Sequence, residues 1–411
     1  MVSVGEILWE PTQEWVEQTN LHAFRQWLKE NHNIEFDDLH QMRRWSLDHL
    51  DDFWQAAWNY FNIEASTPPE AVLGKRTMPG AQWFPESKLN FAQHVLRNEK
   101  PGKTALLYAN EDQVLNGLDW SELAGNVRIL ATELRKMGIK PGDRIACYMT
   151  NIPQAATALL ACSSIGAIWS SCSPDFGTNS VLNRLSQIEP KVLFCVDGYH
   201  YKGKPFNRKA EVKNIVETLP SIERVIYFPY MYPEDEEPPV ENAIFWDELL
   251  DKEPVSADDF KFEQVPFDHP LWILFSSGTT GLPKAIVHGH GGIIIEQYVL
   301  GVLHYNLKPQ DRLFFFTTTG WMMWNFVVRP CFTMPARYFM TAIQFTLNPM
   351  HCGRFVMTLA RPYLVPALRC NKCSKTWDLF QKTNLLLKNY NQLCSPGRSF
   401  LLNAPNGSTT M

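Results

Sequence analysis

Apolar residues recur at helical spacing along two stretches near the start of the chain, with polar turns between them. Leu21, Phe24, Trp27 and Leu28 form one stripe on a helix of 3.6 residues per turn. The members of the second stripe are Leu47, Leu50, Phe53, Trp54, Ala57 and Trp58. Large aromatic side chains at this spacing are typical of packed helices. The pattern therefore predicts a helical cap over the first ~95 residues.

From about residue 104 the pattern changes to short apolar runs that alternate with amphipathic segments. Runs with the length and composition of buried strands lie at 105–108, 144–149, 166–169 and 191–196. Segments with helical periodicity lie at 120–137, from Pro153 onward and from about Asn179. Strands that alternate with helices indicate a mostly parallel sheet covered by helices on both faces. The sequence therefore predicts an α/β fold.

The most distinctive segment joins two further apolar runs, at 271–275 and 285–287. Its nine residues are mainly Ser, Gly and Thr, and they end in Pro and Lys. Small residues let the backbone turn sharply and point N–H groups at an anion, while hydroxyl groups and a lysine add donors and positive charge. The sequence predicts a phosphate-binding loop, whose candidate residues are Ser276, Ser277, Gly278, Thr279, Thr280, Gly281 and Lys284.

Two other structures fit parts of this loop. A Gly- and Ser-rich hairpin explains Gly278 and Gly281, but it does not explain the run of hydroxyl groups together with Pro283 and Lys284. The P-loop of kinases and GTPases has the order G-x-x-x-x-G-K-[ST] and opens a helix. Here two residues separate Gly281 from Lys284, and a strand-like run follows. The loop therefore differs from that P-loop.

The segment 275–285 resembles the signature of the adenylate-forming enzymes, which include acyl-CoA ligases, luciferases and peptide-synthetase adenylation domains. In that family this loop grips the β- and γ-phosphates of ATP while a carboxylate attacks the α-phosphate. The resemblance implies the large N-terminal domain of these enzymes, present in part, with mostly parallel sheets. It also implies ATP, Mg²⁺ and CoA as co-substrates and no tightly bound metal.

Two further segments, at 164–191 and at 317–325, resemble the branch of this family that ligates acetoacetate to CoA. The segment 83–92 resembles the N-terminal cap that is shared with acetyl-CoA synthetases. Together the resemblance covers residues ~40–328. It implies acetoacetate, ATP and CoA as small-molecule substrates.

In related ligases the Gly-Trp segment borders the acyl pocket, so the resemblance implies that Trp321, Met322, Trp324 and Asn325 surround a short acid. Bulky side chains leave room for a small acid only, and Asn325 offers a donor to a keto oxygen. These residues also fit an apolar core strand that contains a buried asparagine.

Lys202 and Lys204 align loosely with a basic segment near the CoA phosphates in acetyl-CoA synthetases, and they also fit a solvated loop. His288 and His290 lack a carboxylate or Cys at local ligand spacing. A second cluster lacks the spacing of a zinc finger, and its members are His351, Cys352, Cys370 and Cys373. We therefore expect no metal site.

Composition indicates the cellular compartment and the classes of partner that the protein could bind. A formal net charge of −5 gives no basic face for nucleic acid. No stretch reaches the ~18–20 consecutive apolar residues of a membrane-spanning helix, and the N-terminus lacks the pattern of a secretory signal. Nine cysteines, an odd number, fit a reducing compartment. We expect a cytosolic protein without a nucleic-acid or membrane partner.

Composition changes abruptly near Arg329. Residues 1–329 hold 42 of the 43 acidic residues, whereas the last 82 residues hold only Asp378 together with nine Lys and Arg. The family's later motifs, which bind adenine, Mg²⁺ and ribose, and its C-terminal domain are not found after Val328. We therefore divide the chain into an acetyl-CoA-synthetase-type cap at 1–98, a truncated AMP-binding domain at 99–328 and an unrelated basic tail at 329–411.

Three functions fit this division. The first is the ligation of acetoacetate to CoA through an acyl-adenylate. The second is a non-catalytic, truncated form that keeps part of a nucleotide site, and the third is ligation of a different short acid. On this division we expect the chain alone not to make acetoacetyl-CoA at a useful rate.

Overall fold

The computed structural model describes residues 7, 10–110, 115–234, 236–276, 281–309, 311, 313, 315, 317–328 and 339–340. Its central element is a seven-stranded sheet with the order β10-β9-β6-β4-β5-β12-β13. The strands are β4 (Arg144–Tyr148), β5 (Ile168–Cys172), β6 (Val192–Val196), β9 (Arg224–Phe228), β10 (Ala243–Phe245), β12 (Pro270–Ser276) and β13 (Lys284–Gly289). All neighbouring pairs are parallel except β12 and β13. The prediction of a mostly parallel α/β sheet is confirmed.

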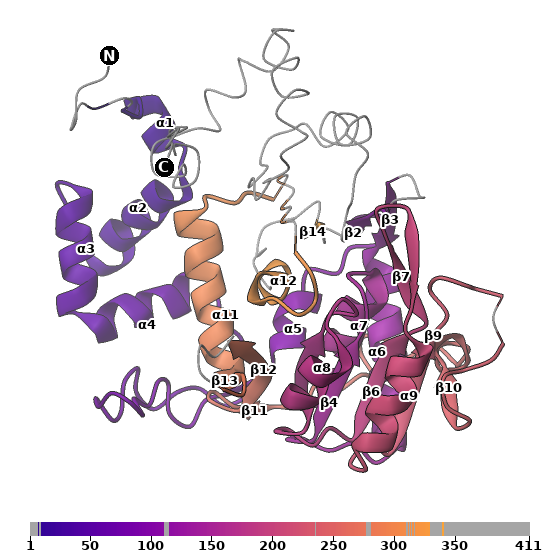
Figure 1. Ribbon diagram of the computed structural model, residues 1–411. Helices are drawn as coiled ribbons and strands as arrows, with labels where there is room; N and C mark the ends of the chain where they lie inside the picture. Colours follow the sequence, from indigo (N-terminus) through magenta and orange to yellow (C-terminus); the bar gives the residue numbers. More distant parts are fainter. Residues whose placement is uncertain are drawn as a thin grey trace, which may run out of the picture.

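Helices cover both faces of this sheet (Figure 1). One face packs against α5 (Phe91–Leu96), α6 (Trp120–Lys136), α7 (Pro153–Ser164), α10 (Trp246–Leu250) and α11 (His290–Tyr298). The other face packs against α8 (Thr178–Leu185) and α9 (Lys209–Thr218). Strand residues alternate between the two apolar clusters, as Ile145 and Cys147 of β4 join the first while Ala146 and Tyr148 join the second. Both faces are therefore buried, which explains the continuous apolar runs in the sequence.

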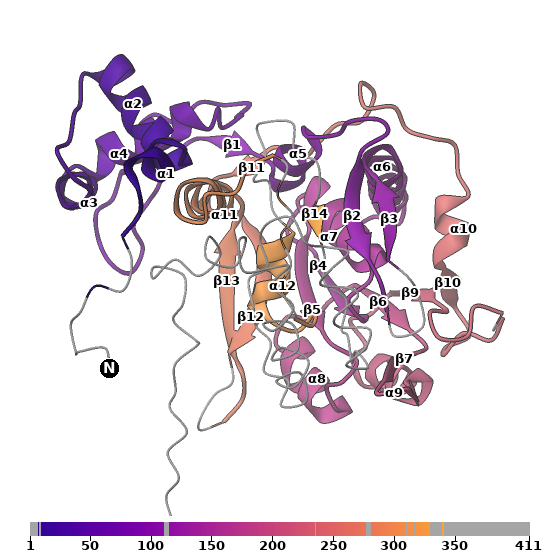
Figure 2. The same ribbon diagram turned by 90° about the horizontal axis from the view of Figure 1, so that it is seen from above.

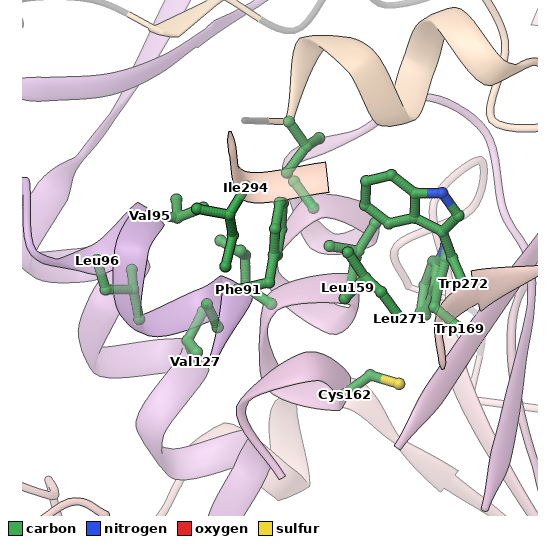
Figure 3. Packing of buried hydrophobic residues seen from close by; sticks show 14 of the residues in the cluster. Phe91, Val95, Leu96, Val127, Leu159, Cys162, Trp169, Leu271, Trp272 and Ile294 are labelled. Carbon is green, nitrogen blue, oxygen red and sulfur yellow. The ribbon is translucent and has the colours of Figure 1, made fainter. Parts of the chain in front are cut away.

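Large aromatic rings fill the middle of the first cluster (Figure 3). Phe91 of α5 meets Trp272 of β12 edge to face, with 5.4 Å between the ring centroids. Trp169 of β5 lies beside them and is fully buried. Edge-to-face pairs of this kind add to the free energy gained by burying the rings. The contact joins a helix and two strands that lie far apart in the sequence.

Asn90 links three separate segments beneath this cluster. Its Oδ1 accepts a hydrogen bond from the Gln93 N–H at 3.2 Å and so caps α5. Its Nδ2 donates to the carbonyls of Ser163 and Glu263, both at 2.8 Å. The side chain is fully buried. The asparagine of the segment 83–92 therefore has a structural role.

The cap consists of α1 (Gln13–Glu17), α2 (Asn20–His32), α3 (Leu39–Asp48) and α4 (Leu50–Tyr60). Figure 2 shows it on the far side of α11 from the sheet. Two of its rings reach the domain, since Phe61 stacks on Tyr298 and Trp58 stacks on Phe267. The predicted second stripe is wrong at Leu47, because the helix is interrupted at His49, between α3 and α4, and the Leu47 side chain is exposed.

Smaller sheets complete the described part of the chain. β1 (Lys88–Leu89) pairs with β11 (Val265–Pro266), and β7 (Gly198–Tyr201) forms a hairpin with β8 (Lys204–Asn207). β2 (Thr104–Tyr108) lies between β3 (Asn116–Asp119) and β14 (Phe339–Met340). Apart from β14, the tail predicted at 329–411 lies outside the described residues, and so do the candidate zinc ligands at 351–373. No helix of the described part is long and apolar enough to cross a membrane.

Acid should unfold this protein steeply, because two buried imidazoles stay neutral in the native state. Burial lowers the pKa of His94 and of His290 to about 3. Unfolded histidine titrates near pH 6.5, so between these values the unfolded chain binds two protons that the native chain does not. We expect the free energy of unfolding to fall by up to about 2.7 kcal/mol per pH unit below pH 6.5. Urea unfolding at pH 7.0, 6.0 and 5.0 measures this slope.

The variant His290→Gln provides the control for this experiment. The Phe91 N–H donates to Nδ1 of His290, so the proton lies on Nε2, which has no partner among the described residues. Removing this imidazole should remove about half of the histidine contribution to the slope. Equal stability of the wild-type chain at pH 7.0 and 5.0 would contradict the assignment.

Candidate functional site

The strand order changes direction at β4, and we refer to the region outside the carboxyl ends of β4 and β5 as the crevice. The chain passes from β4 to its neighbour β5 and then returns to the other side of β4 to form β6. Connections after β4 and β5 therefore leave the sheet in opposite directions. In open α/β sheets ligands bind at such a point, outside the carboxyl ends of the strands. Tyr148 and Cys172 are the last residues of the two strands here.

The loop predicted to bind phosphate starts two strands away from β4, at the carboxyl end of β12. Ser276 of β12 and Lys284 of β13 face each other as a cross-strand pair, so together they close the loop. Lys284 is thus the first residue of a strand. Its side chain is exposed and forms no ion pair with any described residue. A positive charge is therefore available at the base of the loop.

One backbone conformation and one hydrogen bond define the part of this loop that returns to β13. Gly281 has a φ of +139°, a conformation that side chains with a Cβ rarely adopt. The Gln187 side chain, just after α8, donates a hydrogen bond to the Pro283 carbonyl at 3.0 Å. The loop is thereby attached to the layer of helices beside the crevice. The candidate residues Ser277, Gly278, Thr279 and Thr280 lie outside the described residues.

The segment 317–325 crosses the carboxyl edge of β4 and β5. The Ser171 hydroxyl donates to the Thr319 carbonyl at 2.6 Å, and the Thr319 hydroxyl donates to the Met149 carbonyl at 2.7 Å. Gly320 lies so close that a Cβ there would be 2.7 Å from the Phe176 ring. Hydrogen bonds from both strands therefore fix this segment over the crevice.

The four candidate acyl residues have different surroundings. They lie at the start of a helix, α12 (Met322–Val327), and not in a strand. Trp321 and Met322 are 64% and 52% exposed, whereas Trp324 and Asn325 are buried. Trp324 stacks on Trp169 at 6.2 Å between centroids, and Figure 2 shows α12 beside β5 and β12. The structure thus brings Trp324 and Asn325 to the crevice and leaves Trp321 and Met322 on its outer side.

The two candidate CoA lysines lie at the tip of the β7–β8 hairpin, which follows the carboxyl end of β6. Lys202 has a positive φ in the turn, and its Nζ lies 5.2 Å from the centroid of the Tyr201 ring. Both lysines are exposed. Arg208, directly after the hairpin, donates to the Pro174 carbonyl at 2.8 Å. The hairpin is therefore attached to the loop that follows β5, at the same edge of the sheet.

The other titratable groups near the sheet have structural roles. Nδ1 of His288 accepts a hydrogen bond from the Trp272 indole at 2.8 Å, and burial lowers the pKa of this imidazole. Cys172 is a free, buried thiol whose pKa burial raises to about 12. Such a thiol stays protonated and unreactive. Among the described residues no group of three or more His, Cys, Asp and Glu could hold a metal ion.

Comparison with known proteins shows the family. The model of the AMP-binding enzymes matches residues 91–340, and the model of the acetyl-coenzyme A synthetase N-terminus matches residues 39–95. The chain belongs to the AMP-binding enzyme family. The adenylate-forming assignment made from the segment 275–285 is thereby confirmed. The match also extends beyond Val328, where the sequence motifs end.

Several relatives of the chain are named for the acid that they activate. The chain is 38% identical over 331 residues to acetoacetyl-CoA synthetase of Danio rerio, and this matched region covers 79% of this chain and 49% of that protein. It is 32% identical to malonamoyl-CoA synthetase vrtB of Penicillium aethiopicum, covering 79% and 46%. The structure of acetoacetyl-CoA synthetase from Streptomyces lividans matches with a TM-score of 0.76 and 45% identity, covering 82% and 51%. The chain therefore spans about half the length of the relatives it matches.

Two polar residues at the crevice have no counterpart among the candidates predicted from the sequence. Asn151 follows β4 and accepts a hydrogen bond at 2.8 Å from the indole of Trp324. Ser173 follows β5, and its backbone N lies 3.2 Å from the position of a Cβ on Gly320. Ser173 is the first residue after β5, and Asn151 lies three residues after the end of β4. Polar residues at the carboxyl ends of adjacent parallel strands were the available signal.

A methyl group at residue 320 should displace the segment that crosses the crevice. In Gly320→Ala the new Cβ would meet the Phe176 ring at 2.7 Å and the Ser173 backbone N at 3.2 Å. We expect the free energy of unfolding to fall by about 1–3 kcal/mol. We also expect the near-ultraviolet circular dichroism of the Trp169–Trp324 pair to change. Unfolding in urea and the spectrum of the native protein measure these effects.

Gly125→Ala is the matched control, because no atom lies within 4 Å of its would-be Cβ in α6. Alanine should stabilise this helix by up to about 1 kcal/mol. If Gly320→Ala behaves like Gly125→Ala, the segment does not pack as tightly against β5 as described.

Proposed function

We propose that the protein to which these residues belong ligates acetoacetate to CoA in two ATP-dependent steps. The observation that carries this proposal is the Ser-, Gly- and Thr-rich loop, closed by the cross-strand pair Ser276 and Lys284, at the same edge of the sheet as the segment 317–325. Membership of the AMP-binding enzymes and the relatives named acetoacetyl-CoA synthetase support it.

In each step one bond forms and one bond breaks. A carboxylate oxygen of acetoacetate attacks the α-phosphorus of ATP, and pyrophosphate leaves as the acyl-adenylate forms. The thiolate of CoA then attacks the acyl carbon, and AMP leaves. We assign the loop 276–284 to the β- and γ-phosphates, where Lys284 offsets the negative charge that the leaving pyrophosphate carries. Its exposed side chain and the glycine-rich loop suit a phosphate chain.

We assign the remaining substrates from the position of the candidate residues around the crevice. We propose Mg²⁺ as the companion of ATP, and Lys202 and Lys204 as groups that meet the CoA phosphates. We assign the acid to the side of the crevice where α12 begins, with Trp321, Met322, Trp324 and Asn325 as its acyl residues. We place the protein in the cytosol, without a nucleic-acid or membrane partner. The cap at 1–98, the AMP-binding domain at 99–328 and a separate tail at 329–411 remain our division of the chain.

Two other functions are consistent with particular observations. The relative named malonamoyl-CoA synthetase indicates that a related acid can replace acetoacetate. The 411 residues contain no aromatic–Gly–x–Thr–Glu motif, which in this family binds adenine and Mg²⁺. Without it, these residues alone would bind nucleotide and not catalyse the reaction.

Loss of the lysine at the base of the loop should weaken ATP binding. Lys284→Ala removes a charge-assisted contact to the phosphates, which is worth roughly 1.5–3 kcal/mol, or roughly a 10- to 150-fold rise in Kd. Equilibrium dialysis with labelled ATP measures this change, and AMP should lose much less affinity because it lacks the β- and γ-phosphates. Lys213→Ala, at an exposed site on α9, is the control. Equal ATP affinity of wild type and Lys284→Ala would remove the loop from the nucleotide site.

Pyrophosphate exchange into ATP separates the ligase from a chain that only binds nucleotide. Adenylation needs groups on both sides of the nucleotide to act together, and each preorganised donor is worth about 10²–10³ in rate. We therefore expect the purified 411-residue chain to bind ATP and to show no acetoacetate-dependent exchange. Exchange above the level of Lys284→Ala would show instead that these residues suffice for adenylation.

A further inference from the structure

Buried polar atoms without hydrogen-bond partners gather where the segment 317–325 crosses β4 and β5. Asn151 and Asn325 are each 1% exposed. Among the described residues the atoms without a partner at this place are Nδ2 of Asn151, Nε1 of Trp169, Oγ of Ser173, Oγ1 of Thr318 and both amide atoms of Asn325. Native proteins keep few such atoms, and they rarely occur together. Their grouping at the strand-order switch point indicates a polar ligand.

The amide of Asn151 has a defined orientation. The indole Nε1 of Trp324 donates to its Oδ1 at 2.8 Å, so the acceptor end of the amide is already engaged. The NH₂ end is the end that remains, and it offers two N–H donors. Trp324 cannot rotate freely, because it is fully buried and stacks on Trp169. The residue therefore presents a fixed donor at the carboxyl end of β4.

A neutral or negative oxygen is the partner that suits this donor. The acid's carboxylate must lie where it can reach the α-phosphate of ATP, so a second oxygen of the acid is the natural partner for a donor deeper in the crevice. Acetoacetate has such an oxygen on its third carbon, as does malonamate. Butanoate has the same chain length and a methylene group at that carbon.

Access to Asn151 requires a movement of the residues at the start of α12, ahead of Trp324. This helix has six residues and no side-chain cap at its N-terminus. Its first residues, Trp321 and Met322, are already exposed. A shift of Trp321 and Met322 would admit a short acid, whereas the stacking of Trp324 on Trp169 and the hydrogen bonds of Thr319 would hold the rest of the segment in place.

We propose that Asn151 determines the specificity for acids with a carbonyl at the third carbon, by donating an Nδ2–H hydrogen bond to that carbonyl oxygen. Trp324 is a positioning residue that holds the amide in the donating orientation. The inference rests on the proposed function, because it concerns the acid of the same reaction. It assigns a role to Asn151 and gives Trp324 a role other than contact with the acid.

The test compares the binding of acetoacetate and butanoate to the 411-residue chain in the presence of ATP, by equilibrium dialysis with labelled acids. The wild-type chain should prefer acetoacetate by at least about tenfold, because butanoate leaves the donor unpaired. The double variant Asn151→Leu/Trp324→Phe removes both partners of the internal hydrogen bond, which limits the loss of stability. It should bind the two acids about equally. Trp324→Phe alone should reduce the preference less.

The control is Asn98→Leu, which replaces a buried asparagine whose Nδ2 donates to the carbonyls of His94 and Val95 at the end of α5. It should leave the preference unchanged, even if it lowers stability. A folded double variant that keeps the wild-type preference would overturn the role of Asn151. A wild-type chain that binds both acids equally would do the same and leave the phosphate loop unaffected. If ATP promotes the binding of neither acid, the proposed function fails together with this inference.

Discussion

The parallel pairing of β4 with β5 on one side and β6 on the other is the constraint on which the site depends. β5 and β6 lie on opposite sides of β4, so the connections that leave the carboxyl ends of β4 and β5 run away from each other. The segment 317–325 occupies this place and is held by hydroxyl groups of Ser171 and Thr319. A ligand site there is a result of chain topology, whatever the chemistry of the residues that line it.

The predicted phosphate loop is held by the pairing of two backbone strands. Its ends are a cross-strand pair in an antiparallel hairpin, so the sheet itself fixes the separation between Ser276 and Lys284. Where we propose that the acid binds, buried side chains are linked one to another, since Trp169 stacks on Trp324 and the indole of Trp324 donates to Asn151. In the proposed reaction, rigid backbone would hold the phosphates of ATP and a row of packed side chains would hold the acid. The distance between the two reacting groups would then stay constant.

Periodicity and motif content predicted much of the fold. The helix at 120–137, five of the seven strands of the sheet and the adenylate-forming family follow from local sequence, because buried parallel strands have continuous apolar runs. The sequence analysis did not predict β9 and β10. The break at His49 was missed because the apolar spacing of α3 continues into α4. Asn151 was missed for another reason. A lone asparagine after a strand has no distinctive spacing, and its importance arises from Trp324, which is distant in the sequence.

The attachment of the cap has a consequence for the time course of synthesis. Asn20, the first residue of α2, donates from its side chain to the carbonyls of Val302 and Leu307, and its backbone N–H donates to Asn306. These acceptors are 282 to 287 residues further along the chain. At roughly 5–20 residues per second, a ribosome needs on the order of 15–60 s to make them after α2 has emerged. During that interval Phe61 and Trp58 lack Tyr298 and Phe267, the rings on which they stack in the finished fold, so the cap docks later than the helices whose partners lie nearby in the sequence.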